Sequence, residues 1–206
     1  MSILQTNFTK GDEYPILKVQ SKDLSIPFQI IRFSDRKDAS LHDAISFCEW
    51  DNKFENKLKE KNLPKVIPDL FKAGSIIQPD YSLFADAPLI LQKMAVFKKN
   101  KVAVELQEHG LEVIPNLRWG DERSFEFAFA GIPKHQICAI GTYGQIQDKE
   151  KRYLFESGLE EALSKVEPKA VLIYGSMPDS IFASYKKYIS FYQYPSWQAI
   201  YAREAC

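Results

Sequence analysis

From residue 75 onward, short apolar segments alternate with longer segments whose apolar residues have helical spacing, in units of about 30–40 residues. Strands are expected at residues 75–79, 111–119, 136–140 and 170–174, and long helices at 88–110 and 148–166. Strands that are apolar along almost their whole length, joined by helices, are typical of a parallel sheet covered on both faces. The sequence therefore predicts an α/β protein with mostly parallel strands and flanking helices.

The length of the chain limits how this sheet can close. A complete eight-stranded (β/α) barrel takes about 250 residues, whereas this chain has 206 residues. We therefore expect an open sheet or an incomplete barrel. Two further strand-like segments, at residues 28–33 and 44–50, could add an antiparallel edge on the N-terminal side. Residues 1–25 are polar and broken by a glycine and a proline, so an irregular arm is expected before a single α/β domain over residues 26–206.

Shorter elements are predicted between the regular units. Short helices are expected at residues 52–61, 64–71 and 121–130 and from residue 179, and a last strand at 188–192. The charged segment 34–42 is expected to be a loop.

The charge composition bears on what the chain can bind. It has 27 Lys and Arg residues and 27 Asp and Glu residues, so its formal net charge is zero. A protein whose main task is to coat nucleic acid needs a dense basic surface. The composition therefore argues against that class.

Several features predict a soluble, cytoplasmic protein without a membrane partner. No apolar run approaches the roughly 18 residues that a membrane helix needs. The first residues have no basic region before an apolar stretch, so no secretory signal is expected. Cys48, Cys138 and Cys206 form no Cys-x-x-Cys pair, which argues against disulfides and structural zinc. Cys48 and Cys138 are expected to be inert core residues.

The residues with the clearest chemical potential follow the predicted strands. In parallel α/β architectures, ligands bind beyond the carboxyl ends of the strands. The candidate catalytic residues in such positions are Asp80, Asp121, Glu122 and Arg123. The candidate substrate-binding residues are Ser82, Trp119, Ser124, Gly141, Thr142, Tyr143, Gly144, Gly175 and Ser176. An arginine can hold an anionic substrate, glycines permit close backbone approach, and aromatic rings can stack on a base.

Each of these residues also has a structural explanation. Asp80 could form a turn at the end of its strand, Asp121 could be the N-cap of the next helix, and Glu122 could suit the helix dipole. Arg123 could pair with a neighbouring carboxylate. Residues 141–144 could hold a phosphate on backbone N–H groups, although they lack the lysine of a P-loop and the third glycine of a dinucleotide fingerprint.

Metal binding is an open question at one place. An oxygen-rich Mg²⁺ site could form from Asp80, Asp121 and Glu122 if neighbouring strands bring these carboxylates together. The three histidines have no spacing typical of metal ligands. No metal ligand is therefore assigned, and Mg²⁺ is the one candidate cofactor.

Four sequence blocks resemble a family of uncharacterised proteins, a domain of unknown function common in prophages, plasmids and other bacterial mobile elements. The blocks are PDYSLFADAP at residues 79–88, VIPNLRWGDERSFEFAFAGIPK at 113–134, AIGTYG at 139–144 and VLIYG at 171–175. The resemblance covers about residues 26–192 and implies a mobile-element context. The family brings no established activity, so the resemblance implies only that these blocks form a shared site.

A second similarity concerns residues 131–142 and 171–175, which resemble the second half of tRNA-guanine transglycosylase barrels and their phage relatives. Those enzymes exchange a base through aspartates at strand ends. This chain lacks the zinc-binding cysteines of the tRNA enzymes and about half of the barrel.

Two functions of different classes fit these features. The first is an enzyme that acts on a nucleotide, nucleobase or nucleic acid through carboxylates at strand ends, by hydrolysis or glycosyl transfer. The alternative is a non-catalytic binding module that sequesters a ligand or blocks a host, phage or defence protein. Perturbed carboxylate pKa values in a cleft would favour the enzyme, and an exposed aromatic patch of several hundred Å² would favour the binding module. The oligomeric state is left open.

Overall fold

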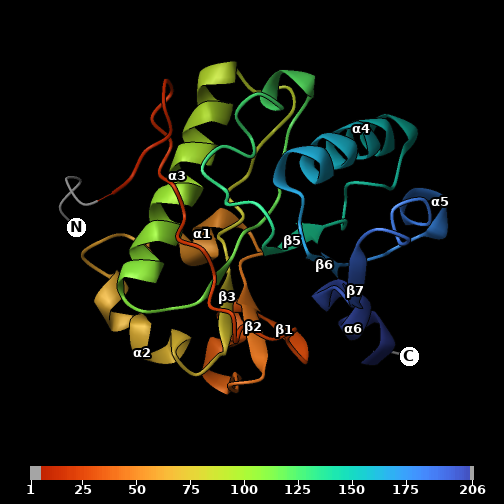
Figure 1. Cartoon of the computed structure of the whole chain (residues 1–206). Coiled ribbons are helices and arrows are strands. Elements are labelled where there is room, and N and C mark those ends of the chain that lie inside the picture. Colours follow the sequence, from red (N-terminus) through yellow and green to blue (C-terminus); the bar gives the residue numbers. More distant parts are fainter. Residues whose placement is uncertain (1–5, 205–206) are drawn as a thin grey trace.

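The computed structural model describes residues 6–204 of the chain (Figure 1). The strands are β1 (Gln29–Arg32), β2 (Asp43–Ser46), β3 (Ser75–Ile77), β4 (Val113–Ile114), β5 (Ile137–Gly141), β6 (Ala170–Tyr174) and β7 (Ser190–Tyr194). The α-helices are α1 (Asp51–Phe54), α2 (Ile67–Leu70), α3 (Leu89–Glu108), α4 (Lys149–Val166), α5 (Asp179–Phe182) and α6 (Trp197–Glu204). Short 3-10 helices are η2 (Phe33–Asp38), η3 (Leu63–Lys65) and η4 (Glu122–Ser124). No helix among residues 6–204 is long and apolar enough to cross a membrane.

The strands form two parallel sheets that follow the order of the chain. β1 to β4 are neighbours in one sheet and β5 to β7 in the other, and every pairing is parallel. An isolated parallel bridge between Asn116 and Ala139 joins the segment after β4 to β5. In the described part of the chain, β1 and β7 each pair with one strand only, so the barrel is not closed. The predicted α/β fold with mostly parallel strands is thus confirmed.

The N-terminal strand pair differs from the antiparallel edge that the sequence allowed. β1 and β2 are parallel, with Gln29 opposite Asp43. The connection between them contains η2 and returns the chain to the starting end of the sheet. A tight hairpin would have reversed the direction of the second strand, whereas this longer connection does not.

Several predicted elements are shorter than expected. The helix expected at 52–61 ends with α1, because Leu58 is the only residue after α1 in this segment that is fully buried. The helix expected at 121–130 is reduced to η4. The strand expected at 111–119 is limited to β4, since Pro115 has no N–H group to donate to a longer ladder.

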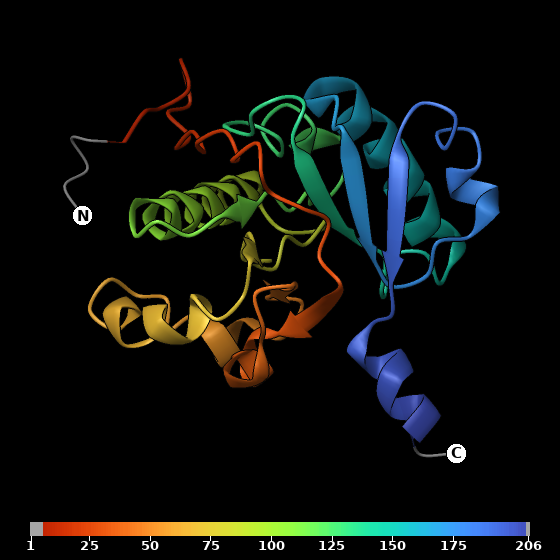
Figure 2. The ribbon, with the colours of Figure 1, turned by 60° about the horizontal axis from the view of Figure 1, so that its bottom comes forward.

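Four groups of buried apolar side chains form the core, the smallest of which consists of Tyr14, Leu83, Val96 and Phe127. The first lies between the first sheet and α1, α2 and α3. The second packs α4 against the second sheet, and Figure 2 shows β5, β6 and β7 side by side with α4 behind them. The third draws on every strand: Ile30, Ala44, Ile77, Ile114, Ile137, Ala139, Ala170, Leu172, Tyr174 and Tyr194. Because side chains alternate between the two faces of a strand, all strands turn one face to a shared interior, as in a barrel with an open side.

The N-terminal arm connects the two sheets. Residues 6–28 contain no helix or strand apart from one isolated bridge. The Nε2 atom of Gln20 donates hydrogen bonds to the carbonyl oxygens of Ile137 at 2.8 Å and Val113 at 3.3 Å. Its Oε1 atom accepts one from the Ile137 backbone N–H at 2.9 Å. One buried amide thus fills the hydrogen-bonding gap between β4 and β5.

Candidate functional site at the carboxyl ends of the strands

Asp80 lies just beyond the carboxyl end of β3 and is half-buried. Its Oδ1 atom accepts a hydrogen bond from Asn116 Nδ2 at 2.9 Å. Asn116 lies beyond the end of the neighbouring strand β4. The parallel pairing of β3 and β4 therefore brings a carboxylate and an amide together at one edge of the sheet, where ligands of such folds bind.

A chain of buried hydrogen bonds holds this pair from behind. Asn100, on α3, accepts a hydrogen bond from Gln78 Nε2 at 2.8 Å. Gln78 Oε1 in turn accepts one from the Asn116 backbone N–H at 3.1 Å. Asn100 also donates to the Ala130 carbonyl oxygen at 2.8 Å. Gln78, Asn100 and Asn116 are all buried. Since buried polar networks with satisfied partners fix side-chain positions, the orientation of Asp80 is set by the fold.

Lys99 adds a buried positive charge to the same region. Its Nζ atom donates to the carbonyl oxygens of Asn116 at 3.1 Å and Ala128 at 3.3 Å. Burial lowers the pKa of Lys99 to about 8, the negative charge of Asp80 opposes this shift, and the positive charge of Arg118 adds to it. A lysine with such a pKa is easily deprotonated, so the charge behind Asp80 depends on pH.

The charge of Arg118 shifts the pKa of both Lys99 and Cys48, and so does the charge of Asp80. Arg118 therefore lies in the same region as Asp80. Its Nε atom is buried and has no hydrogen-bond partner among the described residues. A buried donor without a partner is costly, and a guanidinium is suited to bind a phosphate or carboxylate. We call Asp80, Asn116 and Arg118 the Asp80 cluster.

Cys48 borders the Asp80 cluster from the end of β2. Burial, together with the charge of Asp80, raises the pKa of its thiol far above its usual value, so the sulfur is a neutral thiol rather than a nucleophilic thiolate. A Cβ atom added to Gly141, at the end of β5, would lie 4.0 Å from the Cys48 sulfur and meet no closer atom. Thus the ends of β2 and β5 face each other across the interior.

The residues from 121 to 124 form a compact local turn. Arg123 Nε donates to Asp121 Oδ2 at 2.7 Å, and Ser124 Oγ donates to the Asp121 carbonyl oxygen at 2.6 Å. Arg123 Nη2 also donates to the Ala85 carbonyl oxygen at 3.0 Å. Glu122 is exposed. These contacts tie η4 to the segment before α3 and leave Arg123 engaged with a carboxylate.

The three carboxylates considered for Mg²⁺ do not gather at one point. Asp80 contacts Asn116, whereas Asp121 contacts Arg123. Residues 6–204 contain no group of three or more His, Cys, Asp or Glu side chains that could hold a metal ion.

Two other candidates make contacts elsewhere. Ser82 Oγ donates to Asp51 Oδ1 at 3.1 Å, which links the loop after β3 to the start of α1. The Trp119 ring is buried against α4, where Gly158 leaves space that even one added Cβ atom would fill. Trp119 Nε1 donates to the Leu154 carbonyl oxygen at 3.0 Å. The ring is thus used in packing and is not free to stack on a ligand.

The remaining candidates lie together at the ends of β5 and β6. Thr142 Oγ1 donates to the Ser176 carbonyl oxygen at 2.8 Å. Gly175 has a φ of +123°, and a Cβ atom there would lie 2.6 Å from Thr142 Oγ1, so both conformation and space favour glycine. Tyr143 and Ser176 are exposed, and a Cβ on Gly144 would meet nothing within 4 Å. These two loops therefore expose the side chains of Tyr143 and Ser176, whereas the backbone N–H and C=O groups of Thr142 and Gly175 are hydrogen-bonded within the chain.

Sequence reasoning found Asp80 and missed its supporting residues. Asn116 and Arg118 lie within a segment that was expected to be one long strand, and the charges at 121–124 were more conspicuous. Lys99 and Asn100 were passed over as polar positions of a helix. A usable signal was present, since Gln92, Lys99 and Asn100 are seven or eight positions apart and therefore share a helix face.

α6 lies across the carboxyl ends of β6 and β1, beyond the tips of the second sheet in Figure 2. The Trp197 backbone N–H donates to the Tyr174 hydroxyl at 2.9 Å, and Arg32 Nη2 donates to the Tyr201 hydroxyl at 3.1 Å. The Arg32 guanidinium also lies over the rings of Trp197 and Tyr201, 5.1 and 5.3 Å from their centroids. α6 therefore covers the open side of this end of the molecule.

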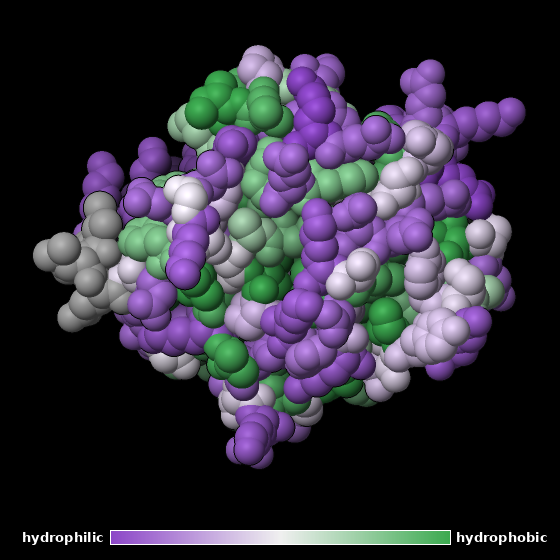
Figure 3. Space-filling model, turned by 45° about the horizontal axis from the view of Figure 1, so that its top comes forward, coloured by the Kyte–Doolittle hydropathy of each residue, from purple (hydrophilic) through white to green (hydrophobic). Residues whose placement is uncertain are grey.

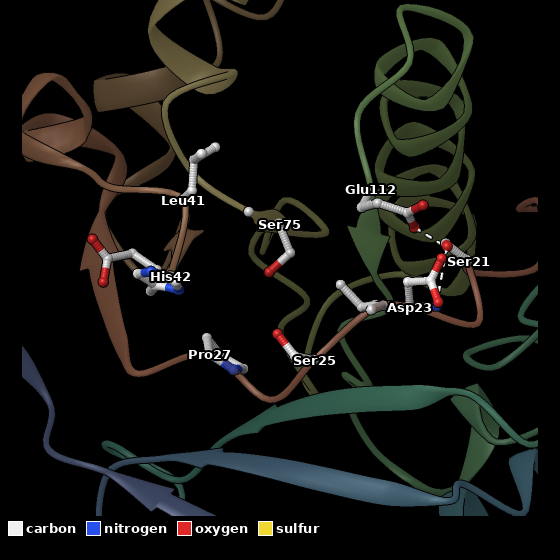
Figure 4. A pocket seen from close by; sticks show the side chains of 11 residues that line it. Ser21, Asp23, Ser25, Pro27, Leu41, His42, Ser75 and Glu112 are labelled. Atoms are coloured by element: carbon white, nitrogen blue, oxygen red, sulfur yellow. Dashed lines mark hydrogen bonds between the residues drawn. The ribbon is translucent and has the colours of Figure 1, made fainter.

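Two pockets lie at the opposite, amino-terminal ends of the strands. One, of about 240 Å³, lies beside the starts of β2, β3 and β4 (Figure 4). In it, Glu112 accepts a hydrogen bond from the Ser21 backbone N–H at 3.3 Å, and Asp43 accepts one from Ser40 Oγ at 2.8 Å. The other, of about 930 Å³, lies along the open side between β1 and β7. The carboxylates of the first pocket hold the arm and a loop in place, and neither pocket includes the Asp80 cluster.

Fold and site together define a class: an α/β protein with parallel strands that holds a fixed carboxylate and an arginine at the carboxyl ends of neighbouring strands. The chain belongs to the family described as Domain of unknown function (DUF4417), whose family model matches residues 9–195. This match confirms the resemblance that the sequence blocks indicated.

Two relatives of this chain are phage proteins. Gene 1 protein of Mycobacterium phage D29 is 30% identical over 134 residues, which are 65% of this chain and 49% of that protein. Gene 1 protein of Mycobacterium phage L5 is 29% identical over 134 residues, 65% of this chain and 58% of that protein. The chain thus spans about half the length of these relatives. No solved structure matches the chain.

Proposed function

We propose that this chain is an enzyme that acts on a nucleotide or nucleobase at the carboxyl ends of its strands. The observation that carries the proposal is the buried hydrogen-bond chain from Asn100 through Gln78 to Asn116, which ends on the half-buried carboxylate of Asp80. A fold that places three polar side chains in its interior to orient one carboxylate has the construction of an active site.

The two charged groups of the Asp80 cluster take different roles in this proposal. Asp80 accepts a proton from an attacking water or substrate group as a general base. Arg118, whose buried Nε lacks a partner among the described residues, holds a phosphate or the negative charge that develops during the reaction. The exposed loops at Tyr143 and Ser176 contact the rest of the substrate.

A thermal-shift panel of Mg²⁺, nucleotides, nucleobases and short oligonucleotides tests this proposal. A ligand at 100 times its Kd adds about 2.7 kcal/mol to the free energy of unfolding, which raises Tm by about 5–10 °C at this chain length. We expect Arg118→Lys to weaken the shift, whereas Asp80→Asn should still bind the ligand that the panel identifies and should lose its turnover. Asp23→Asn, at the amino-terminal ends of the strands, should leave the shift unchanged.

The same panel decides whether the wider set of candidates takes part. Asp121→Asn breaks only the local pair with Arg123, so a lost shift in this variant would extend the site to η4. Unchanged turnover of the identified ligand by a folded Asp80→Asn variant would refute the role of Asp80. No shift with any ligand would favour the alternative, a non-catalytic binding module.

One observation favours that alternative. The first half of α3 presents large apolar side chains to solvent, as protein-binding surfaces do. The two functions are compatible, because α3 contacts the Asp80 cluster with one face and exposes the other.

A further inference from the structure

The exposed face of α3 is apolar. Ile90 is 64% exposed, Met94 60% and Phe97 41%. These residues are four and three positions apart, so they form one stripe along the helix. Leu89 and Leu91 beside the stripe and Phe84 just before the helix are also exposed. Figure 3 shows hydrophobic side chains among polar ones on the face of the molecule where α3 begins. We call these six residues the α3 patch.

The opposite face of the same helix meets the core through apolar residues, among them Val96 and Leu106, and through polar ones. Gln92, Lys99 and Asn100 are buried there and spend their side chains on hydrogen bonds. A surface helix in a globular protein normally has one apolar stripe, which is turned inward, whereas α3 has a second apolar stripe that faces solvent. An outward stripe of this kind leaves apolar area that a partner can remove from water.

The size of the α3 patch suits a specific interface. A large side chain has on the order of 200 Å² to bury, so six such residues that are about half exposed offer on the order of 600 Å². A standard interface takes about 800 Å² from each partner, and its apolar centre is surrounded by a polar rim. The α3 patch therefore supplies most of one side of such an interface.

The charges around the α3 patch indicate the kind of partner. Lys93 pairs with Asp12 at 3.1 Å, and Lys98 pairs with Glu55. Both cations that flank the stripe are thus neutralised within the chain, whose net charge is also zero. A partner of strong charge gains nothing here, whereas a second copy of the same surface meets no repulsion.

We infer that the α3 patch is the interface of a homodimer, in which α3 packs against α3 of a second copy about a two-fold axis. In an isologous interface of this type, the stripe of one copy packs against the same stripe of the other copy. The two stripes run in opposite directions. Met94, near the middle of the stripe, lies close to the axis and faces its own counterpart.

Analytical ultracentrifugation over a range of protein concentrations tests the inference. We expect a dimer for the wild type and a dissociation constant raised more than about 30-fold in Met94→Glu, since a charge would be buried at the centre of the interface. Tyr153→Glu, an equally exposed residue on α4, is the matched control and should remain dimeric. Circular dichroism and thermal melts confirm that each variant is folded.

Cross-linking gives a second test that does not depend on dissociation. In a Cys206→Ser background, Met94→Cys should form a disulfide-linked dimer on mild oxidation, because helices in contact bring facing Cα atoms within disulfide range. Val19→Cys, equally exposed on the arm, should not. A wild type that stays monomeric at its highest soluble concentration would overturn the inference, as would a Met94→Glu dimer of unchanged affinity.

Discussion

Lys99 carries its charge into the interior with only carbonyl oxygens as hydrogen-bond partners. An unfolded lysine has a pKa near 10.4, whereas burial lowers the pKa of Lys99 in the folded protein to about 8. Between these two pH values the unfolded chain still holds a proton that the folded chain has lost. Raising the pH through this window therefore favours the folded state, and below it the full penalty of the buried charge is present.

We predict that wild type gains stability relative to Lys99→Met as the pH rises from about 8 to 10.4, by roughly 3 kcal/mol. Urea denaturation at several pH values measures this difference, because methionine has no proton to lose. Lys61→Met, which replaces an exposed lysine, should show no such window. Parallel pH profiles for wild type and Lys99→Met would contradict the prediction.

At the scale of elements, the N-terminal arm joins the two sheets through the side chain of Gln20. Gln20→Ala would leave the Ile137 N–H and two carbonyl oxygens unpaired between β4 and β5. Unpaired buried backbone groups cost about 1–3 kcal/mol each, so for three groups we predict a loss of at least about 3 kcal/mol and a fall in Tm of at least roughly 6 °C.

Gln107 provides the control for this prediction. It also makes two hydrogen bonds to the backbone of the arm, to Lys18 N–H at 2.8 Å and Lys18 O at 3.0 Å, but these are exposed. Water can replace them, so Gln107→Ala should cost less than about 1 kcal/mol. Equal melting temperatures for the two variants would show that Gln20 does not join the sheets.

How far sequence could predict these elements depends on where their partners lie. β5, β6 and α4 were predicted almost to the residue, because their own apolar residues make up the core. α1 is shorter than expected because, of the residues that follow it up to 61, only Leu58 is fully buried, and η4 is shorter than the helix expected at 121–130. Asp80 was found by its place after a strand. Asn116 and Lys99 were not, since their roles depend on contacts 36 and 17 residues away along the chain.

At the scale of the whole molecule, the zero net charge limits the binding of DNA. Each phosphate contact of a DNA-binding protein contributes to a steep dependence of affinity on salt, and a chain with zero net charge has no excess of cations to make many of them. We predict weak binding to duplex DNA at physiological salt, with a shallow salt dependence. Fluorescence anisotropy with a labelled duplex between 50 and 200 mM salt measures both.

A mononucleotide measured alongside is the comparison that gives this result meaning. If the site takes a small ligand, the protein should bind the mononucleotide and should bind the duplex only weakly. Tight duplex binding that weakens steeply with salt would instead show a basic groove and reverse the prediction.

The division of the core into separate groups has a consequence for synthesis. The first group is complete once residue 113 has been made, and the second draws on residues 117–191. The shared interior, by contrast, is complete only after Tyr194 has been made. The side-chain amide of Gln20 has its hydrogen-bond partners only after Ile137 has been made. Since chains emerge from the ribosome N-terminus first and fold in units, a partly synthesised chain exposes the apolar side chains of the first sheet that face the shared interior. Its N-terminal arm does not yet have the β5 partner of Gln20. We therefore expect the last step of folding to be the packing of the second sheet against these side chains of the first sheet.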